Sequence, residues 1–254
     1  MSKSAVRHKS LQEFLAERGY ATIEELAVRF GVTPQTIRKD INTLAAEGRL
    51  QRFHGGAGVP LGSSNIVYDQ RKSMFMDEKR RIGELVAQHI PEGASLCINI
   101  GTTTEAVARA LLAHKGLRVV TNSLNVASIL AQNSSHDVVV AGGTVRHRDN
   151  GIVGPSAERF IREFRVDYGI IGISGIDEDG NLLDYDYREV AVARTIIECS
   201  RHVYMVTDNS KFGRPAMVRM ARLSDLTALF SNGPLPSPQW ETLVKESGAE
   251  LFLA

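Results

Sequence analysis

The stretch SLCINIGTTTEAVARALLAH, residues 95–114, places an apolar run before a glycine, three threonines and a helix-forming segment. The apolar run is typical of a buried strand, and the residues after Gly101 are typical of a helix. A strand that turns at a glycine into a helix is the repeating unit of an α/β fold. This stretch therefore predicts a strand of a parallel sheet.

The same alternation continues toward the C-terminus. Further apolar runs, separated by helical segments, are LRVVTN (117–122), HDVVVAGG (136–143), YGIIGIS (168–174), HVYMVTD (202–208) and LTALFSN (226–232). Alternation of this kind predicts a mostly parallel sheet with helices on both faces. In such sheets a ligand binds beside the carboxyl ends of the strands.

Small and polar residues follow the predicted strands at that edge. The helix that begins after Gly101 offers backbone N–H groups and hydroxyls, and its dipole favours an anion. We expect a pocket for a small phosphorylated polyol or sugar, with the threonines and Lys211 on the phosphate and Asn99, Asp177 and Glu189 on hydroxyls. The expected effector-binding residues are Asn99, Gly101, Thr102, Thr103, Thr104, Thr121, Asn122, Gly142, Gly143, Gly175, Asp177, Glu189 and Lys211.

Each of these features also has a purely structural interpretation. Glycine and threonine are common where a strand turns into a helix. Glu189 suits the first turn of a helix, where a carboxylate interacts with the dipole, and Asp177 suits a tight turn. The convergence of a cation, two acids and several hydroxyls at one edge of the predicted sheet favours a ligand-binding pocket over these structural interpretations.

The first 57 residues have a different pattern, with three short amphipathic helices separated by glycines. The first is expected from about Val6 to Arg18. The second begins at TIEE, where Thr22 and Glu25 have the spacing of a capping box. The third, TPQTIRKDINTLAAEG (33–48), begins with a residue suited to cap a helix and a proline suited to its first position.

The third helix has one apolar face and one polar face. Ile37, Ile41 and Leu44 fall on one side, and the opposite side carries amides, hydroxyls and cations that suit base edges and phosphates. The following RLQRFHGGA (49–57) predicts a β-wing, which completes a winged helix-turn-helix. The expected DNA-binding residues are Thr33, Pro34, Gln35, Thr36, Arg38, Lys39, Asn42, Arg52, His54 and Gly55. The alternatives are a solvated surface helix or a module that binds another protein.

These patterns predict two domains joined by a linker that is rich in glycine, proline and serine. We expect a winged helix-turn-helix at residues 1–57, a linker at 58–76 and a sugar-phosphate sensor domain at 77–254. Residues 1–60 hold nine Lys and Arg against six Asp and Glu, and the whole chain of 254 residues has a net charge of +1. A basic N-terminal part favours a nucleic-acid partner.

Composition argues against several other classes of protein. No apolar run approaches the roughly 18 residues that a membrane span needs, and the N-terminus lacks the apolar core of a signal peptide. We therefore expect a cytoplasmic protein without a membrane partner. Cys97, Cys199 and the scattered histidines have no metal-binding spacing, so we expect no metal and no cofactor.

The sequence resembles the DeoR family of transcriptional regulators over nearly its whole length. GYATIEELAVRFGVTPQTIRKDINTLAAEGRLQRFHGGA is similar to that family's winged-helix signature. NIGTT, VTNS, AGG, GISGID and DNSKFGR resemble its sugar-phosphate sensor domain. DNGIVGPSAERFI, DYGIIGISGIDEDGNLLDYDYREV and SKFGRPAMV look most like the members that respond to glycerol 3-phosphate.

This resemblance implies a repressor that binds double-stranded operator DNA, and so lies at the nucleoid when bound, and that assembles as a homo-oligomer, a dimer or tetramer. A phosphorylated metabolite, here glycerol 3-phosphate, would bind the sensor domain and release the DNA. The alternative within the family is a repressor that responds to another sugar phosphate.

The family's sensor fold is also similar to ribose-5-phosphate isomerase, which raises the alternative of an enzyme. Those isomerases carry an acidic DGADE-like turn and a following lysine. The corresponding turn here is SGIDE, with Ser174 in place of the first acid, and no lysine occurs between Lys115 and Lys211. Proton transfer needs an acid and a base within reach of the substrate. We therefore expect no catalytic residues and no enzymatic activity.

Overall fold

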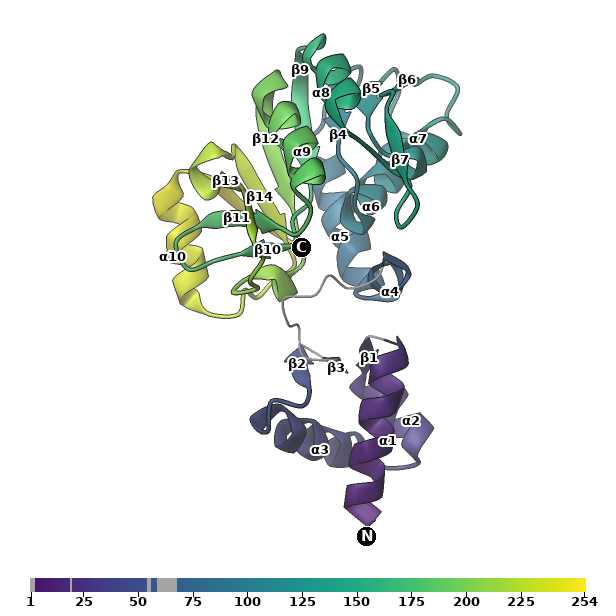
Figure 1. Cartoon of the computed structure of the whole chain (residues 1–254), viewed down its shortest axis with the longest axis vertical. Helices are drawn as coiled ribbons and strands as arrows, with labels where there is room; N and C mark the ends of the chain where they lie inside the picture. The colour runs from purple at the N-terminus through teal and green to yellow at the C-terminus, as the bar shows by residue number, and fades with distance from the viewer. Residues whose placement is uncertain (1–2, 19, 54–55, 59–67) are drawn as a thin grey trace. The chain divides into compact units, whose positions relative to one another are not determined.

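The computed structural model describes residues 3–18, 20–53, 56–58 and 68–254 (Figure 1). The chain divides into two compact units, Met1–Met74 and Phe75–Ala254. The first unit contains the expected helix-turn-helix elements, and the second contains the expected parallel sheet.

The N-terminal unit consists of short helices and one small sheet. Its elements are α1 (Lys3–Arg18), β1 (Tyr20–Thr22), α2 (Ile23–Phe30), α3 (Pro34–Ala46), β2 (Gln51–Phe53), β3 (Gly56–Gly58) and α4 (Tyr68–Ser73). The strands pair antiparallel in the order β1-β3-β2. The wing strands β2 and β3 were expected as a β-wing, whereas β1 and the helix α4, which lies in the expected linker, were not.

Local sequence signals set the ends of these helices as expected. Thr22 and Glu25 form the capping box at the start of α2, and Gly31 ends that helix with a left-handed φ of 62°. The side chain of Thr33 caps α3 by accepting from the backbone N–H of Thr36, and Pro34 takes the first helical position. The core of the unit is apolar and includes Leu11, Leu15, Leu26, Ile37, Ile41 and Leu44.

The C-terminal unit is built on a seven-stranded parallel sheet, as the alternating pattern predicts. The strands are β4 (Ser95–Ile98), β5 (Arg118–Thr121), β6 (Asp137–Val140), β9 (Val166–Ile171), β12 (Ser200–Val206), β14 (Ala228–Ser231) and β15 (Glu250–Leu253). Their order across the sheet is β15-β14-β12-β9-β4-β5-β6, and every neighbouring pair is parallel.

Helices cover both faces of this sheet, as Figure 1 shows. One core contains side chains of α5 (Met76–Ala87), α6 (Thr102–Ala110) and α7 (Leu124–Leu130). The other contains side chains of α8 (Pro155–Arg162), α9 (Tyr187–Cys199) and α10 (Pro238–Ser247). Side chains within one strand alternate between the two cores: Leu96 and Ile98 pack in the first, and Cys97 packs in the second.

Smaller elements lie outside the main sheet. β7 (Thr144–Arg146) and β8 (Gly151–Val153) form a hairpin, and β10 (Gly175–Ile176), β11 (Asn181–Asp184) and β13 (Val218–Arg222) form an antiparallel sheet. Short 3₁₀ helices are η1 (Leu111–Ala113), η2 (Asn209–Lys211) and η3 (Leu223–Asp225). The sequence patterns did not indicate these small strands or β15, because runs of two to five residues carry little periodicity. The ten-residue helix α10 was also not expected.

The strand order has one switch point, between β4 and β9. From β4 the chain adds β5 and β6 on one side, and from β9 it adds β12, β14 and β15 on the other. In folds of this topology the ligand crevice is expected outside the carboxyl ends of the two strands at the switch point. The loop after β4 is the glycine and threonine loop with which the sequence analysis began.

The close approach of α5 to α6 gives a test of this packing. A Cβ atom on Gly83 would lie 2.6 Å from the backbone oxygen of Ala106. Because backbone cannot move aside cheaply, we expect Gly83→Ala to lower the free energy of unfolding by about 1–3 kcal/mol, measured by urea denaturation. Arg81→Ala, at an exposed position of the same helix, is the control. An unchanged or increased stability of Gly83→Ala would contradict the packing.

Candidate functional site

The third helix of the N-terminal unit presents one polar face. Ile37, Ile41 and Leu44 are buried, as expected from the sequence. Of the expected DNA-binding residues, Thr36 is half-buried, whereas those with exposed side chains are Thr33, Pro34, Gln35, Arg38, Lys39, Asn42 and Arg52. His54 and Gly55 lie outside the described residues. The exposed face therefore combines two cations with amides and hydroxyls, the groups that contact phosphates and base edges.

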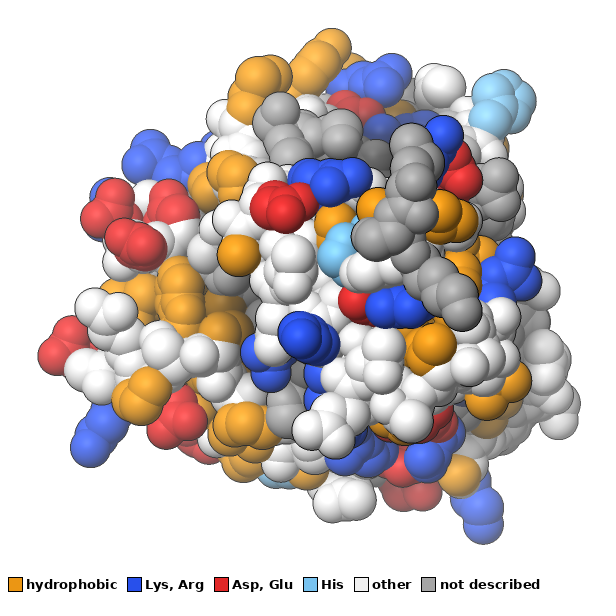
Figure 2. All heavy atoms as spheres, turned by 90° about the horizontal axis from the view of Figure 1, so that it is seen from below, with side chains coloured by type: hydrophobic (Ala, Val, Ile, Leu, Met, Phe, Trp, Pro, Cys, Tyr) orange, Lys and Arg blue, Asp and Glu red, His pale blue; other side chains and the backbone are white. Residues whose placement is uncertain are grey.

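Lys and Arg side chains are dispersed on the face drawn in Figure 2, among uncharged and acidic ones. No broad basic field covers the side chains that this view describes. Arg52 of β2 donates from Nη1 to Oδ1 of Asn42 on α3 at 3.2 Å. This hydrogen bond links the wing to the exposed face of α3.

A buried carboxylate fixes α3 against α1. Asp40 is 4% exposed and accepts hydrogen bonds from Nε and Nη2 of Arg7 at 2.6 and 3.0 Å. Nε2 of His8 lies 2.8 Å from the same carboxylate. Burial raises the pKa of Asp40, but the hydrogen bonds and charges of Arg7 and His8 outweigh it and hold the pKa below its usual value. The sequence analysis did not single out this residue.

In the C-terminal unit, the loop between β4 and α6 lies at the crevice. Gly101 has a φ of 148° and makes no side-chain capping bond, so the first N–H groups of α6 receive no capping side chain. Thr104 donates its hydroxyl to the backbone oxygen of Gly101 at 2.8 Å, and the Asn99 side chain accepts from the N–H of Ile100. Thr102 is half-buried, while Thr103 and Thr104 are buried. This helix start suits an oxyanion.

The neighbouring strand ends supply mostly supporting contacts. Thr121 donates its hydroxyl to the backbone oxygen of Ile98 at 2.6 Å and accepts from the N–H of Ser123. Asn122 is fully buried and donates to the oxygen of Ile152, but its Oδ1 has no hydrogen-bond partner. Gly142 and Gly143 are exposed and lead from β6 into β7. These residues hold the loops in place around the crevice.

Asp177 closes the turn between β10 and β11. Its Oδ1 accepts from the N–H groups of Asp179 and Asn181 at 3.1 and 2.8 Å, and its Oδ2 accepts from the side chain of Asn181. This is the turn role that the sequence left open as an alternative to ligand binding. Gly175 is buried in β10, where a Cβ atom would lie 2.1 Å from the backbone oxygen of Arg214.

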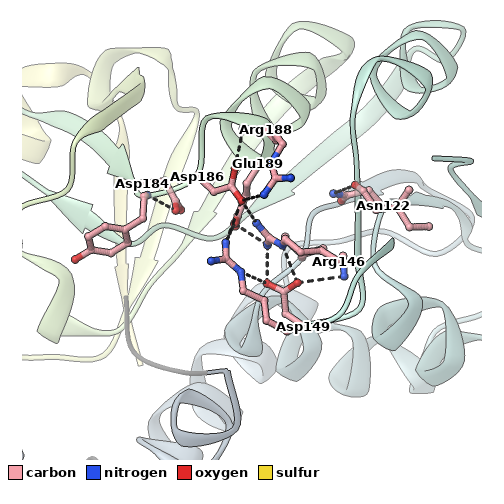
Figure 3. A network of polar contacts seen from close by, with 12 residues as sticks. Asn122, Arg146, Asp149, Asp184, Asp186, Arg188 and Glu189 are labelled. Carbon is pink, nitrogen blue, oxygen red and sulfur yellow. Dashed lines mark hydrogen bonds and ion pairs between the residues drawn. The ribbon is translucent and has the colours of Figure 1, made fainter. Parts of the chain in front are cut away.

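Glu189 belongs to a buried ionic cluster (Figure 3). Arg146, at the end of β7 and 8% exposed, donates to Asp149 at 2.9 and 2.5 Å, to Asp186 at 3.0 Å and to Glu189 at 2.8 Å. Burial lowers the pKa of Arg146, but the surrounding carboxylates outweigh it and raise the pKa above its usual value. Arg148 lies 3.3 Å from Asp186.

This cluster joins the β7–β8 hairpin to the N-terminus of α9. Asp186 caps α9 by accepting from the N–H of Arg188 at 3.0 Å while its other oxygen accepts from Arg146. Burial raises the pKa of Asp186, but the bonds from Arg188 and Arg146 outweigh it and depress the pKa strongly. Because Gly151 of the same hairpin packs against Ile100, the cluster also borders the loop after β4. Glu189 was among the residues expected from the sequence, whereas Arg146, which holds it, was not.

A second charged group lies at the carboxyl end of β12. Asp208 is 2% exposed and accepts from the N–H of Ser210. Burial raises the pKa of Asp208, but the charges of Lys211 and Lys79 outweigh it and lower the pKa. Lys79 is only 5% exposed on α5 and was not among the expected residues. Its only sequence signal is a lysine on the apolar side of an amphipathic helix.

The structure places most of the expected effector residues at the carboxyl ends of β4, β5, β6 and β12 or in the segments that follow them. Gly175 lies in β10, Asp177 lies in the turn after β10, and Glu189 lies in α9, after β11. A Cβ atom on Gly172, which follows β9, would lie 3.8 Å from the backbone oxygen of Ile100 and from Cγ2 of Thr104, so the ends of β4 and β9 adjoin. Among the described residues, no group of three or more His, Cys, Asp or Glu is arranged to hold a metal ion. No described helix has the length and apolar character to cross a membrane.

Comparison with known families matches both units. The DeoR-like helix-turn-helix domain matches residues 7–61, and the DeoR C-terminal sensor domain matches residues 74–233. The chain belongs to the DeoR family. Members of this family at similar length include the glycerol-3-phosphate regulon repressor of Escherichia coli K12, 50% identical over 92% of this chain and 93% of that protein.

The transcriptional repressor CsqR of Escherichia coli K12 is a further relative, 41% identical over 97% of this chain and 94% of its own. Among solved structures, ribose 5-phosphate isomerase A from Neisseria gonorrhoeae aligns with a TM-score of 0.39 and 17% identity, over 53% of this chain and 52% of that chain. CsqR and the glycerol-3-phosphate regulon repressor are both named as repressors, which are not enzymes.

The ion pair between α1 and α3 gives a prediction on stability. We expect Asp40→Asn to lower the free energy of unfolding of the N-terminal unit by about 2 kcal/mol at pH 7, because Arg7 loses a charged partner. Folding lowers the pKa of Asp40 below its value in the unfolded chain, which is about 3.9. Such a carboxyl stabilises the native state fully at pH values above the unfolded pKa. The stabilisation is lost as the pH falls through the lower pKa of the folded protein. The difference between the two proteins should therefore shrink below about pH 4.

Denaturation curves followed by circular dichroism measure this difference. Glu13→Gln, a change of the same kind on the exposed face of α1, is the matched control. Equal stabilities of wild type and Asp40→Asn at pH 7 would contradict a structural role for the pair.

Proposed function

We propose that this protein is a DNA-binding transcriptional repressor of a glycerol-3-phosphate regulon and that glycerol 3-phosphate releases it from operator DNA. The observation that carries the proposal is 50% identity, over 92% of the chain, to a repressor named for that regulon. Family membership of both units supports the division into a DNA-binding part and an effector-binding part.

The N-terminal unit binds DNA through α3 in the major groove. Gln35 and Asn42 present amides that suit base edges, while Arg38 and Lys39 present cations that suit phosphates. The wing contributes Arg52, which the hydrogen bond to Asn42 holds beside α3. Two such units in a homo-oligomer, a dimer or tetramer in the bacterial cytoplasm, bind the half-sites of one operator.

The effector binds at the carboxyl edge of the parallel sheet. Its phosphate lies at the N-terminus of α6, where backbone N–H groups and the hydroxyls of Thr102 and Thr103 are available, with Lys211 as a cation. Its hydroxyls bind near Asn99 and Glu189. Asp177, whose carboxylate accepts hydrogen bonds from its own turn, has a supporting part in shaping the site.

The chain acts as a sensor and has no enzymatic activity. An isomerase-type proton transfer needs two positioned acid–base groups. In the turn after β9, Ser174 stands where the isomerases carry an acid, and Asp177 is engaged by its own turn. A second candidate effector is another phosphorylated sugar, because the match to the DeoR C-terminal sensor domain specifies no single effector.

We expect Lys39→Ala to weaken operator binding about equally on specific and nonspecific DNA, because its ammonium group contacts phosphate. In a plot of log affinity against log salt concentration, the slope should decrease in magnitude by about one unit. Fluorescence anisotropy at several salt concentrations measures this change. Lys9→Ala removes the same charge from an exposed position of α1 and is the control. An unchanged slope in Lys39→Ala would exclude the phosphate contact.

We expect glycerol 3-phosphate to raise the melting temperature of the wild-type protein and to release it from operator DNA. Binding to the native state stabilises it in proportion to RT ln(1 + [L]/Kd). Glycerol, glucose 6-phosphate and fructose 6-phosphate are the comparison ligands in the same thermal-shift and anisotropy assays. Release by another sugar phosphate, but not by glycerol 3-phosphate, would replace the effector and leave the repressor assignment standing.

A further inference from the structure

Arg214 is a buried cation without hydrogen-bond partners. It is 3% exposed, and its Nε, Nη1 and Nη2 atoms are all buried and make no hydrogen bond. Arginine remains charged in proteins, so this guanidinium cannot relieve the cost of burial by losing a proton. A buried charge without a partner is strongly destabilising. The position therefore calls for an anion.

The surroundings hold the guanidinium in place. Its central carbon lies 5.4 Å from the centroid of the Tyr185 ring, and the Tyr185 hydroxyl donates to the backbone oxygen of Pro215 at 3.0 Å. A contact with the face of an aromatic ring uses none of the N–H donors. The Tyr185 ring thus orients the guanidinium without engaging its N–H groups. These groups can donate two parallel hydrogen bonds to one acceptor group.

The turn that carries Arg214 is fixed to the crevice side of the sheet. The N–H of Gly213 donates to the oxygen of Ile176 in β10 at 2.8 Å, and the N–H of Arg214 donates to the oxygen of Lys211 at 3.3 Å. Gly175 of β10 packs so closely on the oxygen of Arg214 that no side chain fits there. Gly175, expected from the sequence to bind the effector, serves to hold this turn.

The turn gathers cationic groups beside a single strand end. Lys79 and Lys211 both act on the buried carboxylate of Asp208, and Arg214 is a third cation in the same turn as Lys211. Of these cations, Arg214 is the one whose side-chain donors are all buried and make no hydrogen bond. A phosphate monoester offers several acceptor oxygens and about −1.5 to −2 charge at pH 7, and a guanidinium binds phosphate oxygens through two parallel hydrogen bonds.

We propose that Arg214 is the principal anion-binding residue of the effector site and that it takes the dianionic phosphate group of a phosphate monoester. This inference rests on the proposed function and deepens it. It assigns the binding of the effector's phosphate chiefly to Arg214, a residue that was not among the expected effector-binding residues. It follows that the sensor domain without effector carries an uncompensated buried charge, which the phosphate neutralises on binding.

Arg214→Met tests this role, because methionine fills a similar space without the charge. If the guanidinium awaits an anion, the variant without ligand is at least as stable as wild type, whereas loss of a structural arginine lowers the melting temperature. Inorganic phosphate should raise the melting temperature of wild type, and its affinity for Arg214→Met should be at least about thirtyfold weaker. Arg219→Met, at an exposed position of β13, is the matched control and should behave as wild type.

The ligands separate the possible sources of the anion. Glycerol 3-phosphate, inorganic phosphate and glycerate are each titrated into wild type and Arg214→Met. Stabilisation by both phosphates but not by glycerate supports the phosphate class. Stabilisation by inorganic phosphate without any effect of glycerol 3-phosphate removes the proposed inducer and supports the anion site. Absence of any phosphate effect on wild type, or equal effects on wild type and Arg214→Met, overturns the proposal.

A spectroscopic measurement on the unaltered protein does not depend on how the methionine variant folds. The Nε–H resonance of Arg214, assigned by its loss in Arg214→Lys, should shift and become protected from solvent exchange when phosphate is added. A resonance that is unchanged at saturating phosphate overturns the proposal.

Discussion

The reversal of strand order between β4 and β9 is the constraint on which the sensor unit depends. Because these two strands pair with each other and the chain builds outward from both, their connecting segments leave the sheet in opposite directions. The polar residues that follow the strands are brought to one edge although they are far apart in the sequence. The uncapped start of α6 and the turn after β12 both lie at this edge.

Electrostatic balance differs between the two charged groups at this edge. The cluster around Arg146 is internally satisfied, since its guanidinium meets Asp149, Asp186 and Glu189. Such a cluster fixes the β7–β8 hairpin on α9 and favours one arrangement of the loops. The group around Arg214 is unbalanced, because its guanidinium has no hydrogen-bond partner. The first group is therefore suited to architecture and the second to recognition.

The sequence predicted those features that depend on local residue patterns. The capping box at Thr22, the N-cap at Thr33 and the buried face of α3 follow from spacing within one or two helical turns. The parallel sheet follows from repeated apolar runs, and the family follows from motifs along the whole chain. Short peripheral strands are harder to predict. β10 has only two residues, and β13 depends on pairing with β11, a segment distant along the chain.

Site residues were harder to predict, because the burial of a side chain and its hydrogen-bond and ion-pair partners are set only by the folded chain. Asp177 and Arg214 both stand in polar, glycine-containing segments, yet one is engaged by its own turn and the other lacks partners. Arg146 and Lys79 give little signal in sequence, because most of the carboxylates that they meet, such as Glu189 and Asp208, are distant along the chain. The position of a residue in the folded chain decides whether it is suited to bind a ligand or to support the site. The spacing of residues in the sequence does not give that position.

The two sides of α3 are chemically independent. The inner side, with Ile37, Asp40 and Ile41, is tied to α1 by apolar packing and an ion pair, whereas the outer side carries Gln35, Lys39 and Asn42. Substitutions on the outer side leave the attachment of the helix intact. Evolution can therefore redirect such a regulator to new promoters by exchanging a few surface side chains, while the response to its metabolite is retained.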